Sequence, residues 1–321
     1  MKINLYLYTQ GLTLGLKEGE VYVKSKEGEI IKTYPSNLIG TIYLYGNIFL
    51  TTQLIKHLLK NEIPVTFLST KGDYIGSLFS ITNKKHLLKY RQWEVFKINE
   101  VKIFLTKETL FQKFEKQKEF LYQQYKNNQL IDEYKKLKEE LEKILLELKR
   151  CNDFEKLNGI EGIFSRLYFS NLGKFIKNSD FYFFERSKYP PKDEFNSLLS
   201  FGYTLLVNFI TGLLFGQNLD PYIGFYHKND YNRPNLALDI MEPFRIYIDR
   251  ICFSLVNLKI LKKENFKKEN GLILIDEEGI KEISKRFQKE FINNDIIINK
   301  LEKTINFIIK TINEKATTLS L

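Results

Sequence analysis

Glycine and proline divide this sequence into two stretches that favour different kinds of secondary structure. Eight of the 17 glycines lie before residue 77, whereas neither glycine nor proline occurs from Ser77 to Asn158. Glycine and proline form turns and interrupt helices, so their absence over so long a stretch favours helices. The sequence therefore predicts an N-terminal β region followed by a helical region.

The first stretch contains short runs of β-branched and aromatic residues that are typical of strands. The runs "VYVKS" and "EIIKTY" flank "KEGE", which predicts a hairpin with Gly28 at its turn. Further strands are predicted at "INLYLY", "LIGTIYLYG" and "IPVTFLS", and one helix is predicted near residues 51–61. Strands spaced in this way are typical of a small sandwich or a barrel-like sheet.

The second stretch has apolar residues at helical spacing. A helix through Leu110 and Tyr125 is predicted to form an antiparallel hairpin, around "KNNQ", with the helix that follows it. The most apolar run, residues 195–216, contains asparagine, serine and threonine, which indicates a buried core helix rather than a membrane span. The amphipathic stripe of the second hairpin helix steps by three and four residues, through Leu130, Tyr134, Leu137, Leu141, Ile144 and Leu148.

These patterns predict an α+β fold, in which a small sandwich-like β domain precedes a larger all-α domain. We place the β domain at residues 1–82, a linker at residues 83–98 and the helical domain at residues 99–321. A chain of 321 residues is long enough to bury two such cores.

The charge balance favours a polyanionic partner. The formal net charge is +10 and the pI is about 9.2, which suits nucleic acid or an anionic surface, although excess lysine also serves solubility alone. The two cysteines, Cys151 and Cys252, match neither a metal-binding spacing nor a disulfide framework. Such cysteine usage is typical of proteins of the reducing cytosol.

The stretch "YHKNDYNRPNLALDIMEPFR" brings histidine and arginine, which are scarce in this chain, together with two spaced acids. One of the three histidines, His227, is followed by Asp239 and Glu242, and one of the few arginines, Arg245, ends the stretch. On a helix the two acids would lie on one face, and Pro243 would kink that helix. Taken alone, two acids at this spacing are also typical of a solvated helix face.

A further acid, Glu161, lies between two glycines in "GIEGIFSRLYF" and precedes an apolar run. An acid in the first turn of a helix, favoured by the helix dipole, is the alternative interpretation. Together with His227 and Glu242, Glu161 forms a mixed oxygen and nitrogen set that suits Mg²⁺ or Mn²⁺, and the imidazole favours Mn²⁺. Tyr168, two turns after Glu161, is interpreted either as a core residue or as part of the same site.

In order and spacing, "GIEGIFSRLYF", "PPKDEFNSLLSFGYTLL" and "GFYHKNDYNRPNLALDIMEPFR" resemble the CRISPR-associated integrase family, the first Cas protein (Cas-one). The N-terminal β region and "DRICFSLVNLKILKKENF" are also similar to that family, so the resemblance covers nearly the whole chain. The family's fold is an N-terminal β domain joined to an all-helical catalytic domain, which agrees with the division predicted above.

The resemblance implies roles for the site residues. In the family a glutamate, a histidine and an acid bind a divalent metal, Mg²⁺ or Mn²⁺, and these positions fall on Glu161, His227 and Glu242. Asp239 falls on the other acid of the catalytic helix. Arg245 matches a basic position near the site, and we expect it to contact a DNA phosphate.

The implied activity is the insertion of short DNA fragments into a CRISPR array, in which a free 3′-hydroxyl attacks a phosphodiester directly. Lys262 and Lys263 are interpreted either as phosphate contacts or as part of a solvated loop. The implied partners are double-stranded DNA, a second copy of the chain and the companion second Cas protein (Cas-two), in the cytoplasm of a prokaryote and with no membrane. A catalytically silent DNA-binding scaffold and a transposon-encoded integrase of the same fold are the alternatives.

Overall fold

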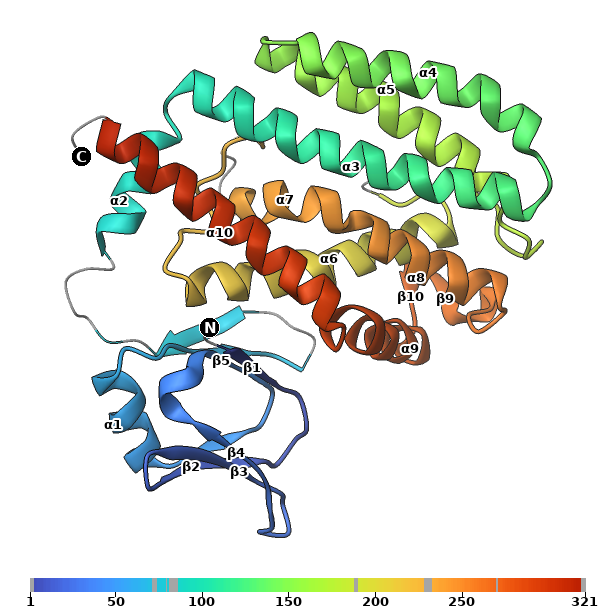
Figure 1. Cartoon of the computed structure of the whole chain (residues 1–321). Coiled ribbons are helices and arrows are strands. Elements are labelled where there is room, and N and C mark those ends of the chain that lie inside the picture. Colours follow the sequence, from blue (N-terminus) through green and yellow to red (C-terminus); the bar gives the residue numbers. More distant parts are fainter. Residues whose placement is uncertain are drawn as a thin grey trace.

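Strands and helices occupy different parts of the structure. The computed structural model describes residues 3–70, 74–78, 80, 86–187, 190–227, 233–269 and 271–318. Within these ranges, strands β1 to β8 precede residue 79 and form a β domain, and the helices from α2 onward form a larger helical body beside it (Figure 1). The predicted α+β fold class is confirmed.

The β domain consists of two four-stranded sheets. The first sheet has the order β1 (Ile3–Leu7), β5 (Ile39–Tyr45), β7 (Val65–Leu68) and β8 (Tyr74–Leu78). The second sheet has the order β4 (Ile30–Pro35), β3 (Glu20–Lys24), β2 (Thr13–Lys17) and β6 (Phe49–Leu50). The predicted hairpin is present, because β3 and β4 pair antiparallel and Gly28 at the turn has a φ of 92°.

Helix α1 (Thr52–Lys60) closes the β domain at the predicted position. The side chain of Thr51 caps it by accepting a hydrogen bond from the backbone N–H of Leu54. Its apolar face, with Leu54 and Leu58, is buried in the core of the β domain together with residues from both sheets. The two sheets and α1 therefore share one apolar core.

Strand β5 is buried on both faces, and its two faces belong to different cores. Ile42 and Leu44 lie in the core of the β domain, whereas Tyr43 and Tyr45 lie in the core of the helical body. Alternate side chains of a strand point to opposite faces of a sheet, so an uninterrupted apolar run such as "IGTIYLY" fits a strand covered on both sides. The first sheet thus lies between the second sheet and the helices.

The helical body contains the helices α2 to α10 and a β-hairpin between α8 and α9. The elements are α2 (His86–Val95), α3 (Asn99–Asn127), α4 (Ile131–Arg150), α5 (Phe154–Gly173), α6 (Glu194–Gly216), α7 (Asn235–Met241), α8 (Arg245–Asn257), β9 (Phe266–Glu269), β10 (Leu272–Ile275), α9 (Glu277–Phe287) and α10 (Asp295–Thr318). Helices α3 and α4 form the predicted antiparallel hairpin. The β9–β10 hairpin is a departure from an all-α body. Residues 83–85 of the expected linker lie outside the described residues, and α2 follows them.

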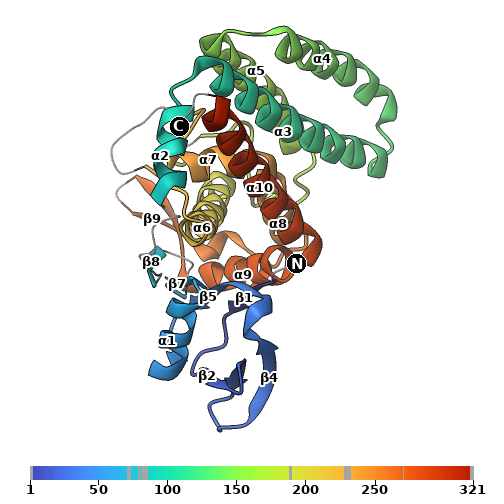
Figure 2. The ribbon, with the colours of Figure 1, turned by 60° about the vertical axis from the view of Figure 1, so that its left-hand side comes forward.

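Helix α6 is the central helix of the body, as Figures 1 and 2 show. By length and composition alone it is long and apolar enough to cross a membrane, but 67% of its most apolar window is buried inside the fold. It packs against α7, α8 and α9 and against strands β7 and β8 of the β domain. This is the burial predicted for a core helix.

Two glycines of α6 allow the first sheet to approach closely. A Cβ atom on Gly212 would lie 2.8 Å from Cδ2 of Leu68, and one on Gly216 would lie 2.7 Å from the hydroxyl of Tyr43. Real Cβ atoms do not approach other heavy atoms so closely, so a larger side chain at either position would require the facing side chain or the helix itself to shift. The C-terminal half of α6 is therefore in direct contact with the β domain.

Gly159 on α5 has no such packing role, and replacing it by alanine is expected to stabilise the protein. A Cβ atom there meets nothing within 4 Å, and alanine has a higher helix propensity and loses less backbone entropy on folding than glycine. We expect Gly159→Ala to raise the free energy of unfolding by about 0.5–1 kcal/mol in urea titrations. Gly173→Ala is the contrasting variant, because its Cβ would lie 2.5 Å from the carbonyl oxygen of Phe183 and should destabilise the fold. A destabilised Gly159→Ala protein would contradict this account of α5.

Candidate active site

The imidazole of His227 is held by the carboxylate of Asp239. Nδ1 of His227 lies 2.7 Å from Oδ1 of Asp239. The backbone N–H groups of Phe225, Tyr226 and His227 donate to the same carboxylate at 2.7, 3.0 and 2.9 Å, and Asp239 is fully buried. A carboxylate that orients a histidine through Nδ1 directs Nε2 outward, which is the arrangement found behind many metal-ligating histidines.

The helix that carries the two acids is irregular at Pro243, as the sequence predicted. Helix α7 ends at Met241, residues Glu242–Phe244 form one 3₁₀ turn, and α8 begins at Arg245. The carbonyl of Asp239, which Pro243 cannot bond, accepts instead from the N–H of Glu242. The tighter turn brings the side chains of Glu242 and Arg245 to the same cavity as His227.

Lys116 contacts this turn, and its contribution to the stability of the protein depends on pH. Its ammonium donates to the carbonyl of Pro243 at 3.0 Å, and burial together with the charge of Lys300 lowers its pKa from 10.5 to about 8. Between these two pH values the unfolded chain binds the proton and the folded protein does not, so the contribution of Lys116 to stability rises with pH. We expect the parent to gain about 1–2 kcal/mol relative to Lys116→Met between pH 8 and 9.5.

Urea unfolding of both proteins at several pH values measures this difference. Comparison with the variant is needed because buried tyrosines with raised pKa values, such as Tyr8, affect both proteins equally. Parallel pH profiles of the two proteins would show that Lys116 does not lose its proton on folding.

Glu242 lies at the centre of the charged residues. Its Oε1 accepts a hydrogen bond from Nε of Arg245 at 2.9 Å and lies 3.8 Å from Nε2 of His227. The guanidinium of Arg245 lies over the ring of Tyr203, 4.5 Å from its centroid, and the hydroxyl of Tyr203 donates to the buried carboxylate of Asp249. The carboxylate of Glu242 and the ring of Tyr203, which Asp249 holds in place, together fix the guanidinium of Arg245. Its other N–H groups can then donate to a ligand.

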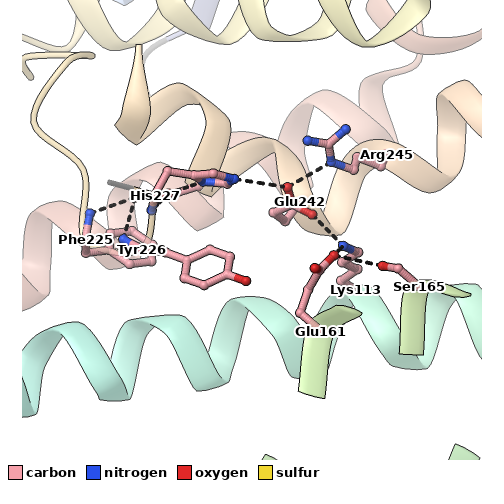
Figure 3. A network of polar contacts seen from close by, with 9 residues as sticks. Lys113, Glu161, Ser165, Phe225, Tyr226, His227, Glu242 and Arg245 are labelled. Atoms are coloured by element: carbon pink, nitrogen blue, oxygen red, sulfur yellow. Dashed lines mark hydrogen bonds and ion pairs between the residues drawn. The ribbon is translucent and has the colours of Figure 1, made fainter. Parts of the chain in front are cut away.

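Glu161 joins the cluster through a buried lysine. Lys113 of α3 is only 4% exposed, and its Nζ lies 2.5 Å from Oε1 of Glu161 and 2.8 Å from Oε2 of Glu242 (Figure 3). The hydroxyl of Ser165, one turn along α5, also donates to Glu161 at 2.8 Å. Lys113 therefore bridges two acids that come from helices far apart in the sequence.

Burial and charge act in opposite directions on the pKa values of this cluster. Burial would lower the pKa of the Lys113 ammonium, but the carboxylates of Glu161 and Glu242 outweigh burial and raise it. Burial would raise the pKa of Glu242, but Arg245, Lys113 and His227 hold it far below its usual range. The pKa of Glu161 is lowered as well, because Lys113 outweighs both burial and the charge of Glu242. The lysine and the two glutamates are therefore charged at neutral pH.

These residues line one cavity of about 630 Å³. Its described lining contains more basic than acidic side chains, namely Lys113, Arg166, Arg186, Arg233 and Arg245 against Glu161, Glu185 and Glu242. Arg186 is anchored by hydrogen bonds to Asn196 at 2.8 Å and Ser200 at 2.9 Å. An excess of arginine in a concave site suits a ligand with phosphate groups.

The chemistry of the donor set fits a divalent cation. His227 has its Nε2 directed toward Glu242, and Oε2 of Glu242 is buried without a hydrogen bond of good geometry, its ion-pair partner being Lys113. The described residues contain no group of three histidine, cysteine, aspartate or glutamate side chains already arranged around a metal position. The ammonium of Lys113, between Glu161 and Glu242, accounts for this arrangement, because both carboxylates are directed at it.

Comparison with known proteins places this chain in a family. The sequence model of the family described as "CRISPR associated protein Cas1" matches residues 5–289. The chain belongs to the Cas1 family. It is 31% identical over 269 residues to "CRISPR-associated endonuclease Cas1 3" of Thermus thermophilus, which covers 83% of this chain and 78% of that protein.

Solved structures share the Cas1 fold over nearly the whole chain. A chain of a "Partial Cas6-RT-Cas1--Cas2 complex" has a TM-score of 0.81 at 21% sequence identity, covering 98% of this chain and 97% of that one. A "Casposase bound to integration product" has a TM-score of 0.76 at 21% identity, covering 97% and 96%. At 21% sequence identity, the similarity to these two structures shows that the fold is shared and nothing more.

The structure brings five of the predicted Cas1 site residues together and leaves two apart. Glu161, His227, Glu242 and Arg245 meet in one cluster (Figure 3). Asp239 joins this cluster through its contact with His227. The two others, Lys262 and Lys263, are exposed beside the β9–β10 hairpin and do not line the cavity. The roles of all seven residues, metal binding and phosphate contact, stay predictions. Tyr168 is a core residue, because it is fully buried and donates to Asp249.

Lys113 and Arg186 belong to the site and were not predicted from the sequence. The sequence does mark Lys113 as unusual, because Lys113 and Gln117 interrupt the apolar stripe of α3 between Leu110 and Leu121. A lysine within a buried stripe requires a negatively charged partner. Arg186 had no such signal, because it lies in a loop whose path follows from the packing of neighbouring elements.

Proposed function

We propose that this Cas1 chain cuts and joins DNA phosphodiesters in a reaction that depends on Mg²⁺ or Mn²⁺. The coarser assignment, a CRISPR integrase and endonuclease role, follows from family membership. The observation that carries the metal-dependent mechanism is the convergence of Glu161, His227 and Glu242 on one cationic cavity, with His227 oriented by Asp239. In the proposed reaction the 3′-hydroxyl of a short fragment attacks a phosphodiester of the target strand directly. The bond from that phosphorus to the 3′-oxygen of the target breaks, and the cut target strand leaves with a new 3′-hydroxyl.

Glu161, His227 and Glu242 would hold the metal ion, which when bound supplies a Lewis acid that activates the hydroxyl and stabilises the charge of the transition state. The protein's own groups have separate tasks. Asp239 holds the tautomer and direction of His227. Arg245, fixed by Glu242 and Tyr203, donates to the phosphate oxygens as charge builds on them.

The proposed partners are double-stranded DNA, a second copy of this chain and the companion protein Cas2. The net charge of +10 and the cationic cavity support DNA as a partner, and a structure of the same fold whose name includes Cas1 and Cas2 supports the companion protein. The second copy of the chain is proposed from the family resemblance alone. We place the activity in the cytoplasm of a prokaryote, which accords with two free cysteines and a prokaryotic relative.

Strand transfer in vitro tests the proposal. The chain, with and without its companion protein, is mixed with a short duplex bearing 3′-hydroxyls and a supercoiled plasmid carrying a repeat. We expect joining with Mn²⁺ or Mg²⁺, no joining in EDTA, and no joining by folded Glu161→Ala or His227→Ala. Joining that persists in EDTA would exclude the metal-dependent mechanism.

Two other outcomes correspond to the alternatives. DNA binding without joining or nicking, in either metal and with the companion present, would leave a DNA-binding scaffold. Efficient joining of transposon-like ends, with no preference for the repeat-bearing plasmid, would favour a transposon-encoded integrase of the same fold.

A further inference from the structure

Lys113 places a positive charge between the two carboxylates that the proposed function assigns to a metal ion. Its Nζ lies 2.5 Å from Oε1 of Glu161 and 2.8 Å from Oε2 of Glu242. We propose that Lys113 is an internal competitor of the divalent ion, which weakens metal binding to the DNA-free protein and leaves the carboxylates when the ion binds. This inference rests on the proposed function, because it concerns the same site.

Space is the first argument for competition. Divalent ions such as Mg²⁺ bind carboxylate oxygens at about 2.1 Å and demand a nearly complete shell of oxygen ligands. An ion held by both Glu161 and Glu242 would therefore lie within the region that the ammonium occupies. The lysine is buried and in contact with both acids, so the two cations cannot keep these contacts at once.

Charge is the second argument. The two glutamates are balanced by Lys113 and Arg245, so these four side chains carry no net charge. A divalent ion added to a balanced cluster is repelled by both cations, and in a buried site such repulsion is large. The attraction that the carboxylates offer the ion is already satisfied by Lys113.

A phosphodiester bound in the cavity would be a new partner for the displaced ammonium of Lys113. Lys113 lines the cavity and has a flexible four-carbon stem, unlike the fixed guanidinium of Arg245. A phosphodiester that enters the cavity would bring negative charge to the ammonium. Lys113 would then couple metal binding to DNA binding, because each would lower the cost of the other.

A purely structural role makes the opposite prediction. If Lys113 only neutralises two buried acids, its removal loosens the cluster and lowers metal affinity. If Lys113 competes with the ion, its removal raises metal affinity. The affinity of the DNA-free protein for Mn²⁺ therefore separates the two roles without any measurement of activity.

The experiment is Mn²⁺ titration calorimetry of the full chain without DNA, for the parent, Lys113→Gln and Lys118→Gln. Glutamine at 113 is neutral and can still donate hydrogen bonds to both carboxylates. Lys118 is the matched control, because it lies on the same helix and, among the described residues, its ammonium pairs with Glu115 alone, at 2.7 Å. We expect Mn²⁺ to bind Lys113→Gln at least about tenfold more tightly than the parent, and Lys118→Gln to bind it within about twofold. The rise in melting temperature on adding Mn²⁺ should also be larger for Lys113→Gln.

Each other outcome is decisive. Mn²⁺ binding by Lys113→Gln that is equal to or weaker than that of the parent overturns the inference and leaves the proposed function standing. Absence of Mn²⁺ binding in both proteins contradicts the proposed function and the inference together. If Lys113→Gln does not fold, Lys113→Met decides, because it also removes the competing charge and keeps an unbranched stem: Mn²⁺ binding tighter than the parent's supports the inference, and equal or weaker binding overturns it.

Discussion

Replacing Glu242 by glutamine is expected to reduce metal-dependent strand transfer and nicking by at least about 10³-fold. The substitution keeps the shape of the side chain and removes its negative charge. Glu242 is the residue at which Lys113, His227 and Arg245 meet, so the variant loses a proposed metal ligand and leaves two cations without their shared counter-charge. Initial rates of joining, measured in Mn²⁺ on the repeat-bearing plasmid, give the effect.

Glu115→Gln is the matched control for this measurement. It makes the same chemical change on α3, at a partly exposed residue that pairs with Lys118, and is expected to join DNA at the parent rate. Circular dichroism and the melting temperature show whether each variant is folded. A folded Glu242→Gln protein that retains more than about a tenth of the parent rate would rule out Glu242 as an essential metal ligand.

Asp239→Asn is expected to lower the free energy of unfolding by about 3 kcal/mol. The two oxygens of Asp239 accept hydrogen bonds from three backbone N–H groups and lie against Nδ1 of His227. An asparagine has one acceptor oxygen, so its amide group would face N–H donors in a buried site and leave them unsatisfied. Urea unfolding measures the loss, and strand transfer should fall as well because His227 loses its orientation.

Asp153→Asn shows what the same change does where only one oxygen is used. Oδ1 of Asp153 caps α5 by accepting from the N–H groups of Glu155 and Lys156. Asparagine caps helices as well as aspartate does, so a change within about 0.5 kcal/mol is expected. Equal stability losses in the two variants would contradict the assigned role of Asp239.

The fold was largely readable from local patterns. The distribution of glycine and proline separated strands from helices, and "IGTIYLY" predicted β5. The hairpin of β9 and β10 was not predicted, because "FKKE" is mostly exposed and rich in lysine. A strand of this kind is specified by pairing with its neighbour, which the residues of one segment do not reveal.

The site was readable where its residues are close in sequence. His227, Asp239 and Glu242 lie within one short stretch, and their roles were assigned from residue type and resemblance. Lys113 reaches the same cluster from α3, and only the packing of α3 against α5 and the 3₁₀ turn shows which acids it meets. Contacts between distant helices depend on the tertiary fold, which no single segment encodes.

Helix α6 joins the two halves of the molecule mechanically. Tyr203, near its middle, lies under Arg245 at the cavity of the candidate site, and Gly216, at its end, lies against Tyr43 of the β domain. Thirteen residues of helix separate these points, a rod of about 20 Å. A partner that binds the β domain in a fixed orientation therefore also fixes the orientation of the cavity. An assembly that binds the β domain would therefore also determine which point along a DNA duplex the cavity faces.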